Sequence, residues 1–159
     1  MDDREKLTRM LRDCRFFGGL EPNQLAALVD IARLQRASRG RRLFEQDTPC
    51  QGLFVVGSGR VKLCRVNPDG KEHILHMADP GQTFAEAAVF GDFDYPVAAE
   101  VVDDAELAFL PKGPMLKLMV DHPQMPLKML ASMSQWLRRL VDLMESIVLR
   151  DAAGRVAKY

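Results

Sequence analysis

Apolar and polar residues change their spacing twice along this chain of 159 residues. Before residue 35 the apolar residues recur at helical spacing, as Leu25 and Leu28 do after Pro22, a residue that favours the first turn of a helix. From 35 to 111 the pattern changes to alternation and short β-branched runs, which predicts several short strands. We expect strands at 42–45, 53–56, 60–65, 72–77, 98–102 and 107–110.

Turn residues separate these expected strands. The segment Gly-Ser-Gly at 57–59 and the segment Asn-Pro-Asp-Gly at 67–70 supply hairpin connections, because Gly, Asn and Asp accept the backbone conformations of tight turns. Short strands with turns at this spacing predict an antiparallel sandwich or barrel. With helices before and after the strands, the predicted fold class is α+β.

The chain becomes helical again at residue 112. A short helix over 112–121 ends at His122-Pro123, and a long helix is expected from about Pro126 to Arg150, or about 37 Å at 1.5 Å per residue. Apolar residues three and four apart along the long helix predict a coiled-coil seam and a homodimer. They are Leu130, Met133, Leu137, Leu140, Met144 and Ile147.

The alternative for this helix is packing on its own barrel. The apolar residues off the seam that could make such a contact are Leu127, Val141, Leu143 and Val148. A helix with more apolar surface than one contact uses favours the dimer.

Charge and cysteine content exclude several classes of protein. The chain has 22 basic and 22 acidic residues, and this balance gives no support for nucleic-acid or membrane binding. No apolar run approaches the roughly 20 residues that span a bilayer, so we expect a cytoplasmic protein. Cys14, Cys50 and Cys64 form no Cys-x-x-Cys pair, so neither a zinc ribbon nor an iron–sulfur cluster is expected.

Charge is nevertheless unevenly placed. Five arginines lie between residues 33 and 42, where a solvated rim is expected and an anion contact is the alternative. From Thr83 to Pro111, a stretch that we call the cassette, there is no Lys or Arg. The acidic residues of the cassette are Glu86, Asp92, Asp94, Glu100, Asp103, Asp104 and Glu106.

Four segments and their order carry a resemblance to a known family. The segments are RLFEQD at 42–47, LFVVGSGRVKL at 53–63, PDGKE at 68–72 and PGQTFAEAAVF at 80–90. The chain thereby resembles CRP/FNR-type bacterial transcription regulators over nearly its whole length. The resemblance implies a jelly-roll-like β-roll of the cyclic-nucleotide-binding type, with N-terminal helices and a long C-terminal dimerisation helix. The segment Phe-Ala-Glu-Ala at 84–87, near the start of the cassette, is most similar to the haem-dependent, NO-responsive subgroup, the DNR-like and HcpR-like regulators.

The cassette departs from the members of this family that bind cyclic AMP. Those members have a Gly-Glu pair and, about ten residues later, an Arg-Ser pair that binds the phosphate; here Ala85-Glu86 and Pro96-Val97 occupy these positions. Because an unpaired, partly buried anion costs several kcal/mol, no cyclic nucleotide is expected. FNR itself needs a cluster of N-terminal cysteines. In this chain Cys14 is the one cysteine near that position, which also argues against an iron–sulfur cluster.

The resemblance implies haem as a candidate cofactor, in an apolar slot between the cassette and the long helix. The residues expected to form the slot are Phe84, Ala85, Glu86, Ala87, Ala88, Val97, Met133, Trp136, Leu137 and Leu140. The alternative is that they form an ordinary core between barrel and helix. The candidate iron ligands, of which at most one or two would bind, are His73, His76, Met77 and Cys14, with His122 as a further candidate.

The spacing of two histidines bears on both the haem ligand and a possible enzyme. His73 and His76 lie three residues apart on an expected strand, so they point to opposite faces and only one can face inward. A cupin-type metal enzyme needs both imidazoles on one metal, so this alternative is rejected. No nucleophile pattern is present either, and we do not expect an enzyme.

These features together predict the sensory and dimerisation part of a CRP/FNR-type regulator that senses NO through haem. Residues 1–123 would form the effector-sensing domain, 124–151 the dimerisation helix, and 152–159 the start of a hinge. DNA would be contacted only through a helix-turn-helix domain that this chain lacks. The alternatives are a regulator that senses another uncharged or apolar metabolite, and a stand-alone module that binds a partner protein.

Overall fold

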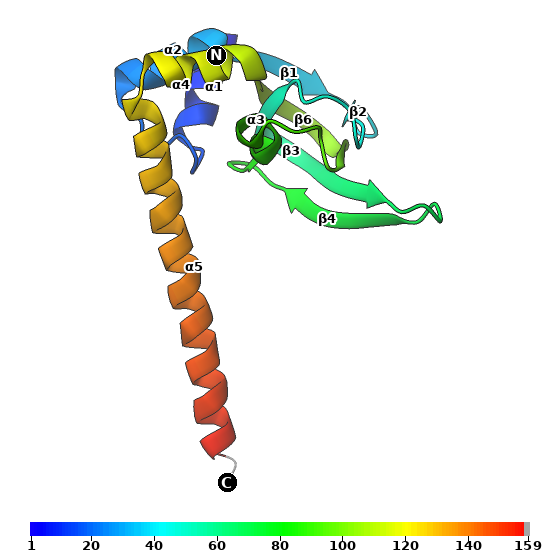
Figure 1. Ribbon diagram of the computed structural model, residues 1–159, viewed down its shortest axis with the longest axis vertical. Coiled ribbons are helices and arrows are strands. Elements are labelled where there is room, and N and C mark those ends of the chain that lie inside the picture. Colours follow the sequence, from blue (N-terminus) through cyan, green and yellow to red (C-terminus); the bar gives the residue numbers. More distant parts are fainter. Residues whose placement is uncertain (158–159) are drawn as a thin grey trace.

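Residues 1–157, the part of the chain whose backbone the computed structural model describes, form five helices and six strands (Figure 1). The helices are α1 (Asp3–Arg12), α2 (Pro22–Ile31), α3 (Glu86–Gly91), α4 (Lys112–Asp121) and α5 (Gln124–Ala157). The strands are β1 (Arg33–Ala37), β2 (Arg42–Phe44), β3 (Gly52–Val66), β4 (Glu72–Ala78), β5 (Thr83–Phe84) and β6 (Ala98–Pro111). The predicted order of helices, strands and helices is confirmed.

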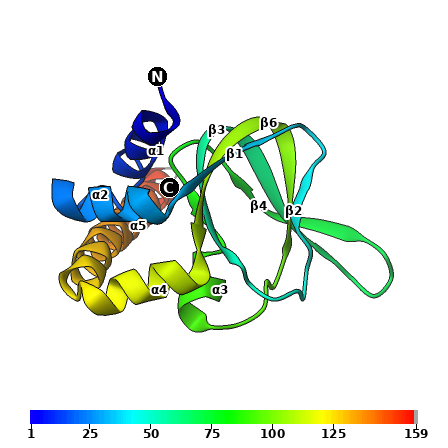
Figure 2. The same ribbon diagram turned by 90° about the horizontal axis from the view of Figure 1, so that it is seen from above.

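The strands form one antiparallel sheet that rolls up on itself. Its order is β1-β6-β3-β4, with β2 also paired to β6 and β5 to β3. Seen from above, the sheet curves around its own interior on one side of the molecule, and α1, α2, α4 and α5 lie on the other side (Figure 2). The predicted α+β class, an antiparallel β-roll with N-terminal helices and a long C-terminal helix, is confirmed.

Two hydrophobic cores lie on opposite faces of β3. Leu53 and Val55 face the helices, whereas Phe54 and Val56 face the interior of the roll, because successive side chains of a strand point to opposite faces. The helix-side core also contains Leu11, Phe17, Leu28, Met115 and Met125. The roll interior also contains Phe44, Phe84, Tyr95 and Val101. The sheet therefore separates the helical layer from an interior of its own.

The two N-terminal helices begin at side-chain caps. Asp2 Oδ1 accepts a 2.8 Å hydrogen bond from the backbone N–H of Glu5 at the start of α1. At the start of α2 the Gln24 side chain accepts a 2.9 Å hydrogen bond from the backbone N–H of Glu21. These caps satisfy donors that the helices themselves cannot use.

Two predicted strand breaks are wrong. β3 and β6 each continue through the segments where a connection was expected, and the pairing of the two strands shifts register from Val56 to Val61. Gly59 has a φ of +82°, and a Cβ there would collide with the carbonyl oxygen of Asp104. The Gly-Ser-Gly segment is therefore a bulged part of a strand and not a hairpin.

Other local predictions are confirmed or shifted. The hairpin at 67–70 connects β3 and β4, with the Asn67 N–H donating a 2.9 Å hydrogen bond to the Lys71 carbonyl. The predicted bounds of α4 are confirmed. β1 begins at Arg33, where the sequence pattern predicted a helix up to residue 34.

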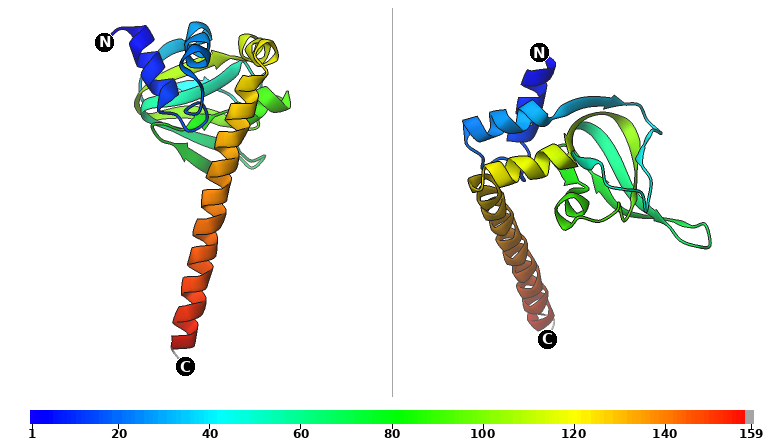
Figure 3. Two further views of the ribbon diagram at one scale, coloured as in Figure 1. Left: turned by 90° about the vertical axis from the view of Figure 1, so that its left-hand side faces the viewer. Right: turned by 45° about the horizontal axis from the view of Figure 1, so that its top comes forward.

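The long helix α5 lies against the domain at its start and then projects away from it, as Figures 1 and 3 show. Met125 and Met129 are buried in the helix-side core. Beyond this packed start the helix projects from the domain and ends at Ala157, later than the predicted Arg150. The exposed apolar residues of this part are Leu137, Val141, Leu143, Met144, Ile147, Val148 and Leu149. None of the described helices is long and apolar enough to cross a membrane.

The off-seam residues of α5 do not meet the barrel, so the contact expected of them is wrong. Leu127, Val141, Leu143 and Val148 are 54–65% exposed. Val141 lies four residues after Leu137, and residues four apart are neighbours on a helix surface. It therefore widens the exposed seam, as Val148 does in the next heptad.

Candidate functional site

A cleft of about 290 Å³, which we call the cassette cleft, lies between the cassette and the first half of α5. Its walls come from the connection after α1, from β3 and β4, from the first residues of the cassette, and from α5. The lining residues are Cys14, Arg15, Phe16, Leu63, His76, Gly81, Gln82, Thr83, Phe84, Ala85, Glu86, Met133 and Trp136. The cleft thus brings together segments that are more than a hundred residues apart in the sequence.

Part of the predicted site lines this cleft. The predicted residues found there are Cys14, His76, Phe84, Ala85, Glu86, Met133 and Trp136. Successive side chains of a helix point about 100° apart, so the first residues of α3 face different surroundings. Glu86 reaches the cleft, Ala87 is exposed and Ala88 packs in the roll interior.

The remaining predicted residues lie elsewhere. Val97 packs against the roll interior, and Leu137 is exposed on α5. Leu140, half-buried one turn further along α5, does not line the cleft either. Each turn advances the helix about 5.4 Å along its axis, and both residues of α5 lie beyond Trp136, the last α5 residue in the lining of the cleft.

Glu86 supplies an unsatisfied carboxylate to the cleft. Ala85, the residue before α3, adopts a left-handed conformation with φ of +69°, which costs a residue other than glycine about 1 kcal/mol. Glu86 Oε2 is buried and has no hydrogen-bond partner among the residues that the structure describes. A buried unpaired acceptor costs roughly 1–3 kcal/mol, so a hydrogen-bond donor brought to this oxygen would stabilise the site.

Cys14 lies in the same wall as a protonated thiol. Burial raises its pKa from 9.0 to about 11, and the nearby Glu86 carboxylate raises the pKa as well, against the lowering effect of backbone N–H groups at Phe16 and Phe17. A thiolate, the form that binds metals, is therefore scarce at neutral pH.

The other candidate iron ligands occupy different environments. The exposed imidazole of His76 borders the cleft. His73 Nε2 lies 2.7 Å from Asn67 Nδ2 near the β3–β4 hairpin, away from the cleft. Met77, half-buried on β4, and the exposed His122 after α4 do not line the cleft either. Of the two histidines on β4, only His76 is therefore placed to contact a ligand.

Two residues that the sequence analysis did not identify form the N-terminal wall. The Phe16 ring stacks on Phe90 of α3 with ring centroids 5.9 Å apart. The Arg15 guanidinium carbon lies 5.5 Å from the centroid of the Trp136 ring, a cation–π contact that joins the connection after α1 to α5. No sequence motif marks these residues, because their role depends on how the connection folds across the cassette.

The position of the missing phosphate contact is occupied by the protein itself. The Pro96 carbonyl accepts hydrogen bonds of 3.2 and 3.0 Å from Nε and Nη2 of Arg65. Next to it, Tyr95 stacks on Phe44 with ring centroids 3.7 Å apart, and its hydroxyl donates a 2.9 Å hydrogen bond to the Gly52 carbonyl. Aromatic side chains thus fill the interior of the roll here.

Several carboxylates of the cassette are neutralised by cations outside it. Glu100 lies 3.2 Å from Lys62 Nζ, Glu106 lies 3.0 Å from Lys6 Nζ, and Asp92 is paired with Lys112 at 2.6 Å. The ion pair lowers the pKa of Asp92. The acidic side chains of the cassette therefore lie mostly on the outer surface, and Glu86 is the cassette carboxylate that lines the cleft.

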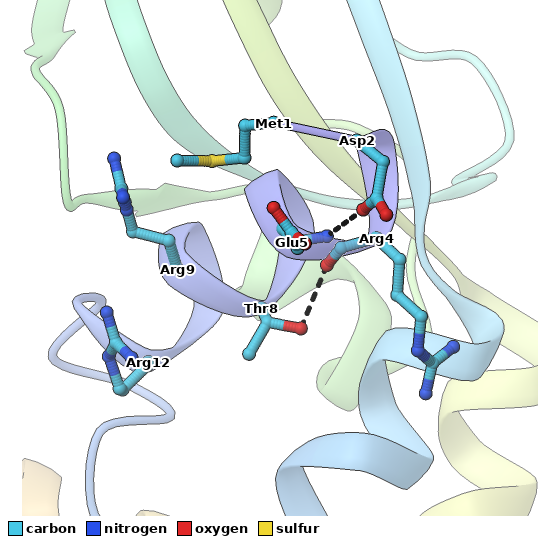
Figure 4. Close-up of a pocket in the computed structure, with 7 residues that line it drawn as sticks. All are labelled: Met1, Asp2, Arg4, Glu5, Thr8, Arg9 and Arg12. Atoms are coloured by element: carbon cyan, nitrogen blue, oxygen red, sulfur yellow. Dashed lines mark hydrogen bonds between the residues drawn. The ribbon is translucent and has the colours of Figure 1, made fainter.

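A larger hollow of about 530 Å³ lies over α1 and is shown in Figure 4. Its polar groups are already used within the protein. Asp2 caps α1, Thr8 Oγ1 donates a 2.9 Å hydrogen bond to the Arg4 carbonyl, and Arg4 Nη1 lies 2.7 Å from Asp30 Oδ1. The hollow is an uneven charged surface on one helix, and we do not treat it as a ligand site.

A β-roll with a ligand-sized cleft against a long projecting helix defines a sensor domain of the cyclic-nucleotide-binding type. Residues 34–122 match the cyclic nucleotide-binding domain family, and the chain belongs to that family. Its homologues are CRP/FNR-type regulators.

Three relatives show how far this similarity extends. The CRP-like cAMP-activated global transcriptional regulator of Mycobacterium tuberculosis is 26% identical over 152 residues, which cover 96% of this chain and 68% of the relative. DNR from Pseudomonas aeruginosa is 30% identical with a TM-score of 0.83 over 100% of this chain and 70% of that one. The sensor domain of the transcriptional regulator DNR alone gives 29% identity and a TM-score of 0.73, over 89% of this chain and 95% of that one.

Proposed function

We propose that this chain is the effector-sensing and dimerisation part of a CRP/FNR-type transcription regulator, with its effector in the cassette cleft. One observation carries this proposal: Met133 and Trp136, in the cleft wall, belong to α5, the helix that carries the exposed apolar seam. An occupant of the cleft would therefore act directly on the helix, and population shift between two dimer arrangements would transmit the signal. DNA binding would require a helix-turn-helix domain outside this chain.

The chemistry of the cassette supports an effector other than a cyclic nucleotide. The name of the M. tuberculosis relative includes activation by cAMP. In this chain Pro96-Val97 replaces the expected Arg-Ser pair, and Arg65 already binds the Pro96 carbonyl. A cyclic phosphate in the roll would lack a charged partner and would have to displace Tyr95 and Phe44.

Haem is our candidate cofactor, on the basis of the donor groups in the cleft. The imidazole of His76 and the thioether of Met133 both border it, and both groups ligate haem iron in proteins. Phe84 and Trp136 supply apolar walls. Bound haem would supply an iron centre that takes up NO. Cys14 is a poor ligand, because its raised pKa keeps the thiol protonated.

A haemin titration tests this proposal. Wild-type protein should give a Soret band at one haem per chain, and the band should shift when NO is added. His76→Ala should weaken haemin binding at least about tenfold, because it removes the imidazole that we assign to the iron. His73→Ala is the matched control, since that imidazole is bonded to Asn67 outside the cleft, and it should bind haemin like the wild type. Absence of stoichiometric uptake, or equal behaviour of the two variants, would contradict the assignment.

A small uncharged metabolite is the second candidate effector, favoured by the size of the cleft. A volume of about 290 Å³ is at the lower end of small-molecule sites and encloses only part of a macrocycle. The unpartnered Glu86 oxygen would accept a hydrogen bond from such a molecule. Native mass spectrometry of protein purified from cells distinguishes the two candidates by the mass that remains bound.

The exposed apolar face of α5 supports the proposed homodimer. Of the predicted seam residues, Leu130, Leu137, Met144 and Ile147 are 48–65% exposed, while Met133 and Leu140 are half-buried. A second copy of this helix would cover the same stripe by symmetry.

A further inference from the structure

A second cavity of about 290 Å³ adjoins the cassette cleft and shares Arg15 and Trp136 with it. We call it the basic cavity. Ser132, Gln135 and Arg139 of α5 form one wall, and the backbone at Gly18 and Gly19 forms the other. No acidic residue lines it.

The two arginines of this cavity have no ionic partner. Neither Arg15 nor Arg139 forms a salt bridge within residues 1–154, where side chains are described. The acids in the neighbouring connection are paired with other cations: Asp13 lies 3.4 Å from Arg12 Nε, and Glu21 is paired with Lys128. Both side chains are exposed and line the same cavity, so an anion bound there could accept charge-assisted hydrogen bonds from two guanidinium groups.

Uncharged donors surround the same space. A Cβ on Gly19 would lie 2.7 Å from Ser132 Oγ, so the backbone of the connection approaches α5 as closely as glycine permits. The N–H groups of Gly18 and Gly19 make no hydrogen bond within the described residues. Together with the Ser132 hydroxyl and the Gln135 amide, they offer an oxyanion several donors besides the guanidinium groups.

The cavity also stays accessible in the proposed dimer. Arg139 lies seven residues after Ser132, on the same face of α5, and neither belongs to the seam. Arg15 borders both the basic cavity and the cassette cleft, whereas Glu86 lines only the cleft. A ligand with an apolar body would therefore direct a negative group towards Arg15 and away from Glu86.

We propose that the basic cavity binds an oxyanion, a carboxylate or a phosphate, carried by an organic molecule whose apolar part occupies the cassette cleft. The effector would then be an acidic amphiphile, held by Arg15 and Arg139 at its charged end. This inference rests on the proposed function in placing the apolar part. The anion contact itself depends only on the residues of the basic cavity.

Metal-free protoporphyrin IX and its dimethyl ester test the anion contact without any iron ligation. The acid should bind more tightly than the ester, and its binding should weaken as salt is added. Arg15→Gln and Arg139→Gln should each weaken binding of the acid about threefold to tenfold. Binding of the ester should stay unchanged in Arg139→Gln, because Arg139 lines the basic cavity and not the cassette cleft. Arg138→Gln is the matched control, because this arginine is the neighbour of Arg139 but does not line the cavity. Binding is measured by porphyrin fluorescence and by Trp136 quenching.

A phosphate titration separates failure of this inference from failure of the proposed function. Inorganic phosphate should shift the amide NMR signals of Gly18 and Gly19 in the wild type and not in Arg15→Gln. If neither porphyrin binds but phosphate shifts these signals, the anion site stands and the porphyrin-like effector does not. If acid and ester bind equally and the arginine variants change nothing, the anion site is overturned while the cleft stays a ligand site. If no probe binds, the anion site and the porphyrin-like occupant of the cleft both fail, and the small uncharged metabolite remains the candidate effector.

Discussion

The two halves of α5 differ in what holds them in place. From Gln124 to Trp136 the helix is fixed by its own domain: Met125 and Met129 are buried, Lys128 is paired with Glu21, and Arg15 lies over Trp136. From Leu137 to Leu149 the apolar side chains are exposed, apart from the half-buried Leu140, and the helix projects from the domain. The first half therefore belongs to the fold of one chain, whereas in the proposed dimer a second copy would bury the apolar face of the second half.

The position of the boundary between these halves matters for function. Lys128, Ser132 and Trp136 lie four residues apart and so form one stripe, which faces the connection between α1 and α2. The cassette cleft and the basic cavity meet at the last residue of that stripe. Both proposed ligand sites therefore lie where contacts of α5 with its own domain end and contacts with the proposed partner would begin.

The largest expected effect comes from a charge in the second half. Leu137→Glu should raise the dissociation constant of the dimer at least about a hundredfold, because burial of each leucine contributes roughly 2 kcal/mol and the symmetric seam carries the change twice. Sedimentation equilibrium measures this constant. Asp142→Lys, a charge change on the same half but off the seam, should leave it unchanged, and an equal loss in both variants would contradict the seam.

The next largest effect should be a loss of domain stability when a side chain in the first half of α5 is truncated, with no such loss for the second half. Met125 is fully buried, so Met125→Ala should lower the free energy of unfolding of the domain by about 2–4 kcal/mol through the cavity that it creates. Val148→Ala, on the exposed half, should change the stability of the monomer by less than about 0.5 kcal/mol. Urea denaturation of both variants in the Leu137→Glu background removes the contribution of the dimer. Similar losses in the two variants would mean that the halves do not differ as described.

A smaller effect should follow from alkaline pH at the connection that holds the first half. The pKa of Cys14 is raised from 9.0 to about 11 in the folded protein, so the unfolded chain releases this proton first as the pH rises. The stability from the buried thiol is complete below about pH 9 and is lost as the pH rises through about 11, by roughly 2–3 kcal/mol. Cys14→Ala should lack this part of the loss. Fluorescence of Trp136, the single tryptophan of the chain, reports unfolding in both proteins.

The sequence predicted the fold well where local chemistry and tertiary structure agree. Pro123 follows the end of α4, and the segment Asn-Pro-Asp-Gly forms the hairpin at 67–70, so these residues interrupt regular structure in the fold as their local preferences predict. The split of β3 was wrong because Gly57 and Gly59 favour turns locally, whereas close contact with β6 uses them for a bulge. β1 was missed because its five residues lack a clear apolar alternation.

The candidate site was predictable only on the side that carries a motif. Phe84 and Glu86 were found through the cassette, and Met133 and Trp136 as residues of the long helix that could face it. Arg15 and Arg139 were missed, because nothing in either segment indicates that the connection after α1 crosses α5 at the fourth turn. Such a contact is set by the packing of α1 and α2 on the sheet, which a local pattern does not contain.

The bare half of α5 also acts as a mechanical lever. From Trp136 to Ala157 the helix extends about 31 Å beyond its last support, at 1.5 Å per residue. A rotation of only about 10° at the cleft would move its far end by about 5 Å, close to one full turn of a helix. A ligand that shifts Trp136 by no more than the length of a covalent bond would therefore displace the far end of the helix several times as far.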